Sequence, residues 1–179
     1  MTFDEVINKR KSTRNFSNKS VELEKLIRIC ETARLAPSSC NSQPWIMHIV
    51  TEQSKEINEL RKACQFFGLN KFLNNVNNFI VVEQDYGNLT VKVGSSFTKN
   101  DLNSIDLGVL ASYIVLKAAD EGLGTCIIGG FRKETILKAM NFSDKQTIRF
   151  VIAIGYDNEQ EEKTSKTKRK KVEDVIKIH

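Results

Sequence analysis

The chain has 179 residues, and its 27 lysines and arginines against 22 aspartates and glutamates give a formal charge of +5. Hydrophobic residues make up 40% and charged residues 27%, which fits one globular domain, residues 1–179, with a sizeable core. We expect no apolar run to be long enough to span a bilayer, and the N-terminal segment lacks the apolar stretch of a signal peptide. We therefore expect a cytoplasmic protein that does not contact the membrane.

Cysteine and histidine content limits the metal and nucleophile chemistry of the chain. Its four cysteines, Cys30, Cys40, Cys64 and Cys126, include no C-x-x-C pair, which favours reduced, packed thiols. The two histidines lie at position 48, in a strand-like run, and at position 179. A zinc site or a Cys–His nucleophile needs partners that this sequence hardly offers, so no metal is predicted.

The first half of the chain is predicted to alternate helices with extended segments. Thr2 and Glu5 form a capping box that opens a first helix, which runs to about Lys11. Ser20 is expected to cap a second helix that ends near residue 36, before Pro37. The other predicted elements are an extended stretch at 12–20, an irregular loop at 38–44, a strand at 45–51, a helix at 54–67 and a buried strand at 78–84.

The second half is predicted to contain the most apolar helix. Apolar residues cover nearly all its faces over 105–119, so it should be buried in the domain or at an interface. The other predicted elements are a polar loop at 85–101, a strand or turn at 125–130, a helix at 132–140, a strand at 147–155, a lysine-rich tether over 157–171 and an extended segment at 172–178.

Three segments carry groups suited to ligand binding, although none is specific alone. Residues 9–14, Lys-Arg-Lys-Ser-Thr-Arg, place cations and a hydroxyl at a helix end, where they could bind phosphate. Residues 37–45, Pro-Ser-Ser-Cys-Asn-Ser-Gln-Pro-Trp, form a polar loop between two prolines. The glycines of residues 122–131 could let the backbone approach a ligand closely, but they form neither a dinucleotide fingerprint nor a P-loop.

Together these segments resemble one family, the FMN-dependent nitroreductases. Residues 10–14 are similar to its R-x-S-x-R element, and residues 36–45 to its A-P-S-S-x-N-S-Q-P-W signature. Asp106-Leu-Gly, with the glycines at 122–130, resembles its third element. Ile154-Gly155-Tyr156 and the basic run 168–175 resemble its C-terminal ending, so the match covers nearly the whole chain in family order.

The resemblance implies a set of cofactor-binding residues. Arg10, Lys11, Ser12, Lys168 and Arg169 would hold the FMN phosphate or ribityl chain, and Arg14 would face the pyrimidine edge. The Gly129 backbone amide would donate a hydrogen bond to flavin N5, so no side chain is predicted to be catalytic. The remaining predicted contacts are Pro37, Ser38, Ser39 and Asn41 from the other subunit, and Asn70, Ile128 and Gly130.

The resemblance also implies the fold, the partners and the reaction. The fold would be α+β, with a mostly antiparallel sheet flanked by helices. Two copies would form an intertwined homodimer in which residues 157–179 reach the partner and exchange a C-terminal strand. NADH or NADPH would reduce FMN, and a nitroaromatic, quinone or other small flat acceptor would then take the electrons in a ping-pong cycle.

Departures from the family pattern and rival functions accompany this prediction. Cys40 stands where the family often has glycine, and Gly129 where some relatives carry glutamate. One alternative is another flavin enzyme on the same scaffold, such as a dehalogenase or an enoate or dehydro-peptide oxidoreductase. Another is a non-catalytic FMN-binding redox protein. The basic run at 163–171 lacks interleaved aromatic residues, which disfavours nucleic-acid binding.

Overall fold

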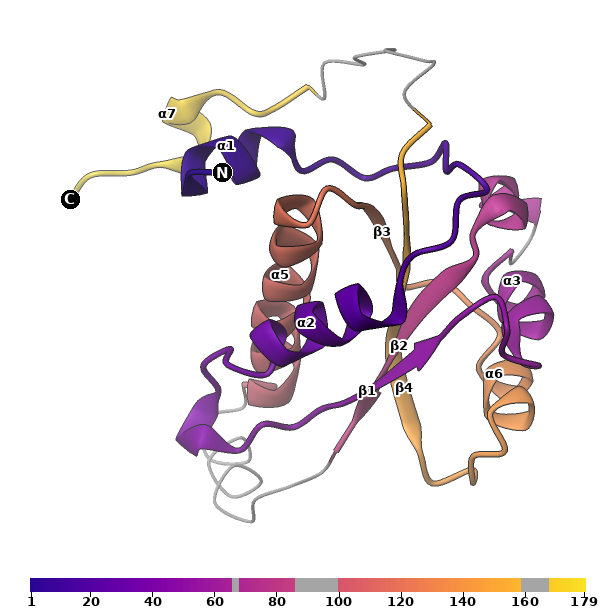
Figure 1. Ribbon diagram of the computed structural model, residues 1–179. Coiled ribbons are helices and arrows are strands. Elements are labelled where there is room, and N and C mark those ends of the chain that lie inside the picture. Colours follow the sequence, from indigo (N-terminus) through magenta and orange to yellow (C-terminus); the bar gives the residue numbers. More distant parts are fainter. Residues whose placement is uncertain (66–67, 86–99, 159–167) are drawn as a thin grey trace.

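The computed structural model describes residues 1–65, 68–85, 100–158 and 168–179. Its centre is a four-stranded antiparallel sheet in the order β1-β2-β4-β3 (Figure 1). The strands are β1 (Ile46–Val50), β2 (Asn78–Gln84), β3 (Gly124–Ile128) and β4 (Thr147–Gly155). The predicted α+β fold, an antiparallel sheet flanked by helices, is confirmed.

Alternation of side chains along the central strand β2 builds one core on each face of the sheet. Phe79 and Val81 belong to the cluster covered by α3 (Ile57–Cys64) and α6 (Lys133–Ala139). Ile80 and Val82 belong to the cluster covered by α2 (Leu23–Ala33) and α5 (Leu102–Asp120). Figure 1 shows the two helix pairs on opposite sides of the sheet, which gives a three-layer arrangement.

The long helix α5 connects the two ends of the molecule. Asp101 caps it by accepting a hydrogen bond from the Ser104 N–H at 3.1 Å. The helix packs against α2, α1 (Phe3–Lys9) and β3, but Ile105 remains 58% exposed and Tyr113 remains 37% exposed. An apolar strip of α5 therefore lies uncovered on the single chain.

By length and composition α5 is also the one helix in the described ranges that could cross a membrane. Of the 18 consecutive residues of α5 with the highest mean hydropathy, 44% are buried inside the fold. The sequence-based statement that no run reaches that length is therefore wrong. Packing against the sheet and two helices accounts for the apolar composition of α5.

Several predicted boundaries need correction. The capping box of α1 is confirmed, since Glu5 N–H donates to Thr2 Oγ1 at 3.3 Å and Thr2 N–H donates to Glu5 Oε2 at 2.7 Å. Ser20 does not cap α2, because Glu22 occupies that position without a side-chain hydrogen bond. The C-terminal segment predicted as extended begins instead with a short helix, α7 (Val172–Val175).

The remaining short elements are η1 (Ser39–Asn41) and η3 (Lys71–Asn75), both 3-10 turns. Most of the predicted specificity loop at 85–101 and most of the tether at 157–171 lie outside the described residues. The end of the helix predicted at 54–67 lies outside them too.

Candidate functional site

The predicted phosphate-binding segment, residues 10–14, is fixed to the edge of the sheet beside β3. The Thr13 N–H donates to the Thr125 carbonyl at 2.9 Å, and Ser12 forms a parallel bridge with Thr125. The close approach of Thr13 to β3 requires glycine at position 124, because a Cβ there would lie 2.8 Å from Thr13 Cβ. Backbone pairing thus places Arg10, Ser12 and Arg14 on a defined path across the sheet edge.

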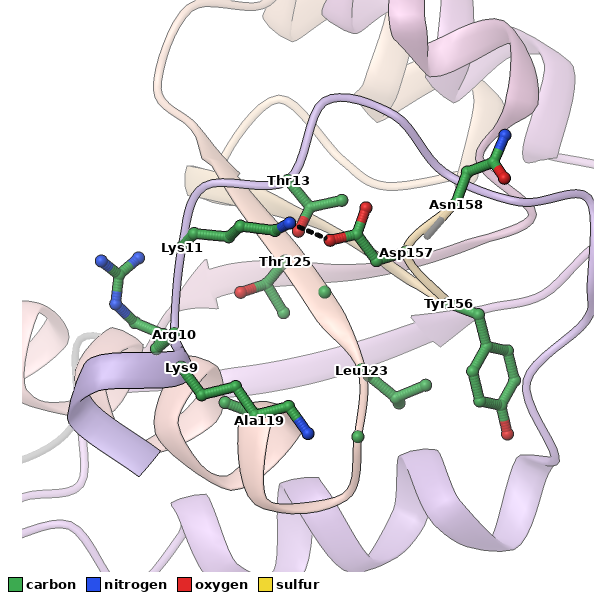
Figure 2. A pocket seen from close by; sticks show the side chains of 12 residues that line it. Lys9, Arg10, Lys11, Thr13, Ala119, Leu123, Thr125, Tyr156, Asp157 and Asn158 are labelled. Carbon is green, nitrogen blue, oxygen red and sulfur yellow. Dashed lines mark ion pairs between the residues drawn. The ribbon is translucent and has the colours of Figure 1, made fainter. Parts of the chain in front are cut away.

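A cavity of about 590 Å³ lies next to this segment and is lined by Ala119 and by residues 9–11, 13, 122–125 and 156–158 (Figure 2). Lys11 Nζ forms an ion pair with Asp157 Oδ2 at 2.5 Å, so its charge is already compensated. The Arg10 side chain points away from that pair in Figure 2. Arg10 pairs with no carboxylate in the part of the chain that the structure describes, so it remains available for an anion.

Arg14 and the end of β3 form a second part of the site. Burial raises the pKa of the Cys126 thiol, and the nearby positive charge of Arg14 partly opposes this rise. Arg14 is exposed, and its Nη1 donates to the Ser12 carbonyl at 3.4 Å. The Arg14 guanidinium therefore lies close to β3, the strand that ends directly before Gly129.

The glycines after β3 present open backbone. Gly129 and Gly130 are exposed, and no atom would lie within 4 Å of a Cβ added at either position. The Gly129 N–H has no acceptor among the described residues, so it is free to donate to a ligand. Ile128 is only 3% exposed and its side chain belongs to the core, so any contact it makes would use its backbone.

The polar loop around η1 adopts an unusual backbone conformation. Cys40, Asn41 and Gln43 have φ angles of 51°, 51° and 47°, in the left-handed region that side chains other than glycine disfavour. Such residues cost on the order of 1–3 kcal/mol each, so surrounding contacts must hold them. Ser38 Oγ accepts from the Gln43 N–H at 2.9 Å, and Gln43 Nε2 donates to Asn41 Oδ1 at 3.2 Å.

Asp106 anchors the same loop from α5, a role that its place in the Asp106-Leu-Gly motif does not reveal from the sequence. Both carboxylate oxygens lie 3.0 Å from the Ser39 nitrogen, and Oδ1 also accepts from Ser39 Oγ at 2.9 Å. The exposed Pro37 and Asn41 flank these anchored serines. The loop thus combines a fixed base with polar groups that face solvent.

The two groups of predicted contacts do not meet within one chain. Ala119, near the C-terminal end of α5, lines the cavity beside Arg10, whereas Asp106, near the other end, holds the loop. The two residues are thirteen steps apart along the helix, which at 1.5 Å per residue is about 20 Å. Figure 1 likewise shows α1 and the loop at opposite ends of α5. A ligand that contacts both groups would need the loop of a second chain.

The remaining predicted contacts lie apart from the cavity. Asn70 has left-handed backbone angles (φ 58°, ψ 34°), and its Nδ2 donates to the Cys64 carbonyl at 3.0 Å. Lys168 and Arg169 are exposed and are absent from the cavity lining. Neither pairs with a carboxylate within the described ranges, so both cations are available, but their meeting with Arg10 remains a prediction.

Potential metal ligands and thiols are the other reactive side chains of the molecule. Within the described ranges, no group of three His, Cys, Asp or Glu side chains is placed to hold a metal ion. Burial raises the pKa of Cys30 to about 11 and that of Cys64 to about 12, so both are thiols at neutral pH. Cys40 is exposed on the η1 loop.

Comparison with known proteins assigns the family. The model of the nitroreductase family matches residues 7–86 and 67–156. A 4-nitrobenzoate reductase of Pseudomonas putida is 24% identical over an alignment of 195 positions, which covers 88% of this chain and 86% of that protein. The chain therefore belongs to the nitroreductase family, and an oxidoreductase activity follows from that membership.

Solved structures agree with this assignment. An FMN-dependent nitroreductase from Clostridium difficile R20291 is similar with a TM-score of 0.71 and 29% identity, over 97% of this chain and 96% of that one. A nitroreductase family protein from Clostridium novyi NT is similar with a TM-score of 0.76 and 27% identity, over 89% and 87% of the two chains. The similarity thus extends over most of the chain.

Proposed function

We propose that the protein is an FMN-dependent oxidoreductase that transfers electrons from NADH or NADPH to nitroaromatics, quinones or similar small flat acceptors. The observation that carries the proposal is that two arginines without a carboxylate partner and a backbone N–H without an acceptor, all among the described residues, lie along the same edge of the sheet. Arg10 and Arg14 flank the edge of β3, and the free Gly129 N–H follows the same strand. The relatives named as an FMN-dependent nitroreductase and a 4-nitrobenzoate reductase support the same cofactor and substrate class.

The residues available on this chain fit the chemistry of FMN. Arg10, with Lys168 and Arg169 from the C-terminal segment, would bind the phosphate through charge-assisted hydrogen bonds, and Ser12 would contact the phosphate or ribityl chain. Lys11 would contribute less than predicted, because Asp157 already neutralises it. Asn70 would reach the pyrimidine edge through Oδ1, since its Nδ2 is in use within the chain.

The ring would be held by backbone and positive charge. The Gly129 N–H would donate to N5, with Gly130 leaving space for a flat ring, and Arg14 would stabilise negative charge at the pyrimidine edge. Bound FMN would supply hydride acceptance and donation at N5, in a ping-pong cycle in which nicotinamide and acceptor use the same place in turn. No protein side chain is needed as a nucleophile or a base.

We further propose that the functional unit is a homodimer. The loop residues Pro37, Ser38, Ser39 and Asn41 would contact the flavin of the partner, because the two positions of α5 beside which the loop and Arg10 lie, Asp106 and Ala119, are about 20 Å apart along the helix. The uncovered strip of α5, with Ile105 58% exposed, would form part of the interface. The C-terminal segment would cross to the partner, which would cover Val172 and Ile178, 67% and 96% exposed on the single chain. The cytoplasmic location stays a prediction from the sequence.

The absorption spectrum of the purified protein tests the proposal. We expect a yellow protein whose flavin band is bleached anaerobically by NADH or NADPH and restored by an acceptor such as 4-nitrobenzoate or a benzoquinone. A protein that stays colourless and cannot be reconstituted with FMN would contradict the cofactor assignment. A flavoprotein that oxidises NAD(P)H no faster than free FMN would instead be a non-catalytic binding protein, and a panel of acceptors would separate the other flavin enzymes of this scaffold.

A further inference from the structure

We infer that Asp106 is a positioning residue that sets how the loop of residues 37–43 presents its polar groups to the flavin. The inference rests on the proposed function, because it assigns a role within the proposed FMN site. Asp106 lies on α5, 67 positions from Ser39 in sequence, and is only 4% exposed.

The contacts of Asp106 are all directed to one loop residue. Its two oxygens receive the Ser39 N–H and its Oδ1 receives the Ser39 hydroxyl, at 2.9–3.0 Å. No cation pairs with it among the described residues. A buried carboxylate without a cation is expensive, and an apolar side chain would usually serve stability better. The arrangement is therefore better explained by the orientation it imposes on Ser39.

This anchoring determines the hydrogen-bond polarity of the two loop serines. Because Ser39 donates both its N–H and its O–H to Asp106, its hydroxyl can offer a ligand only lone pairs. Ser38 differs, because its hydroxyl oxygen accepts from the Gln43 N–H and its hydrogen stays free to donate. The loop would thus present an acceptor at 39 beside a donor at 38.

The anchor also precedes the strained part of the loop. Cys40 and Asn41, both with φ of 51°, follow Ser39 directly. Since Ser39 is held at both its nitrogen and its hydroxyl, the direction of the chain entering these residues is fixed. Release of Ser39 would let the two left-handed residues relax toward ordinary angles and would turn the Asn41 side chain away.

FMN titration of the full-length protein, stripped of flavin and followed by fluorescence quenching, tests the inference. Asp106→Asn should weaken FMN binding at least about tenfold, because an amide accepts from Ser39 without charge and brings an N–H₂ that has no acceptor there. Glu121→Gln is the control, since Glu121 ties the C-terminal end of α5 to α2 through Arg28 but lies away from the loop. The control should bind FMN within about twofold of the wild type.

Two further measurements separate positioning from general loss of stability. If Asp106 acts through Ser39, Ser39→Ala and Asp106→Asn should be strongly non-additive, with the double variant binding FMN more tightly than the product of the two single fold-losses predicts. The visible circular dichroism of the bound flavin should change in Asp106→Asn and not in Glu121→Gln. Hydrogen exchange of the Ser39 amide, measured without flavin, should be faster in Asp106→Asn.

The outcomes distinguish this inference from the proposed function. A wild-type protein that binds no FMN would overturn the proposed function and this inference with it. The positioning role alone would be overturned if the wild-type protein bound FMN and Asp106→Asn matched it in three measurements. These are the FMN affinity, the visible circular dichroism of the bound flavin and the exchange rate of the Ser39 amide. Additive losses in the double variant would also overturn it. If Asp106→Asn did not fold, the Ser39→Ala variant would decide the question. An FMN affinity of Ser39→Ala equal to that of the wild type would overturn the positioning role.

Discussion

Replacement of Gly124 by alanine would test how closely residues 10–14 depend on the edge of β3. A Cβ at position 124 would lie 2.8 Å from Thr13 Cβ and 2.9 Å from Thr13 Cγ2. Rotation of the Thr13 side chain cannot move its Cβ, and the residue is only 2% exposed, so the backbone must separate. Overpacking of this kind costs about 1–3 kcal/mol. At roughly 3 °C per kcal/mol for a chain of this size, Tm should fall by about 3–9 °C.

The same change should weaken FMN binding, because the shift would break the 2.9 Å bond from the Thr13 N–H to the Thr125 carbonyl and displace Arg10 and Arg14. Differential scanning calorimetry and FMN titration measure the two effects. Thr13→Gly combined with Gly124→Ala removes the clashing Cβ and should recover FMN affinity relative to Gly124→Ala. A Gly124→Ala protein with wild-type Tm and FMN affinity would refute the reasoning.

The other predictions concern charge and thiol burial. Arg169→Ala should weaken FMN binding by roughly 1.5–3 kcal/mol, whereas Lys177→Ala should not, and equal affinities measured by titration would remove Arg169 from the site. Asp157→Asn should tighten FMN binding severalfold at low salt, because it removes a carboxylate from the basic cavity; weaker binding would contradict that role. At pH 8 iodoacetamide should label the exposed Cys40 and spare Cys64, because burial raises the pKa of Cys64 to about 12. Peptide mapping measures the labelling of each cysteine, and faster labelling of Cys64 than of Cys40 would contradict the prediction. The unfolded chain ionises Cys64 near its ordinary pKa of 9.0, so the stability from its burial is complete below pH 9 and is lost as pH rises toward 12; denaturant titration of wild type and Cys64→Ala at several pH values measures this loss.

Local composition was enough to predict the centre of the fold. The ranges predicted for the two central strands, 78–84 and 147–155, agree with β2 and β4 residue for residue. Both are runs rich in β-branched and aromatic residues that are buried in the sheet, so the sequence favours a strand over a helix there. The capping box at Thr2 was predictable for a similar reason, since both of its partners are three residues apart.

Helix ends and the final segment were harder to predict. Ser20 is a favourable cap by residue type, but α2 begins at Leu23 with Glu22 before it, because the path of the chain decides which residue caps. The segment 172–178 has an apolar, β-branched pattern, yet residues 172–175 form a helical turn in the single chain. An isolated segment lacks a neighbouring strand to pair with, and tertiary contacts normally decide such cases.

The candidate site was predictable only where it carries a family motif. The residues of the loop 37–43 and of the segment 10–14 could be named from the sequence, but their partners could not. Asp106 meets Ser39 across 67 positions, and Lys11 meets Asp157 across a still longer stretch. No periodicity or spacing encodes such pairs, because they depend on how α5 and β4 pack in three dimensions.

The central claim is that each FMN site is built from the cations of one chain and the loop of another. Two variants test it: one carries Arg10→Ala and Arg14→Ala, and the other carries Ser38→Ala and Asn41→Ala. Each alone should lose FMN binding and NAD(P)H-dependent reduction. After unfolding and refolding as an equimolar mixture, half of the dimers would be mixed, each with one intact site, so about a quarter of wild-type activity should return. Mixed dimers without any recovered activity would contradict the account, because they would show that both groups of residues serve a site within a single chain.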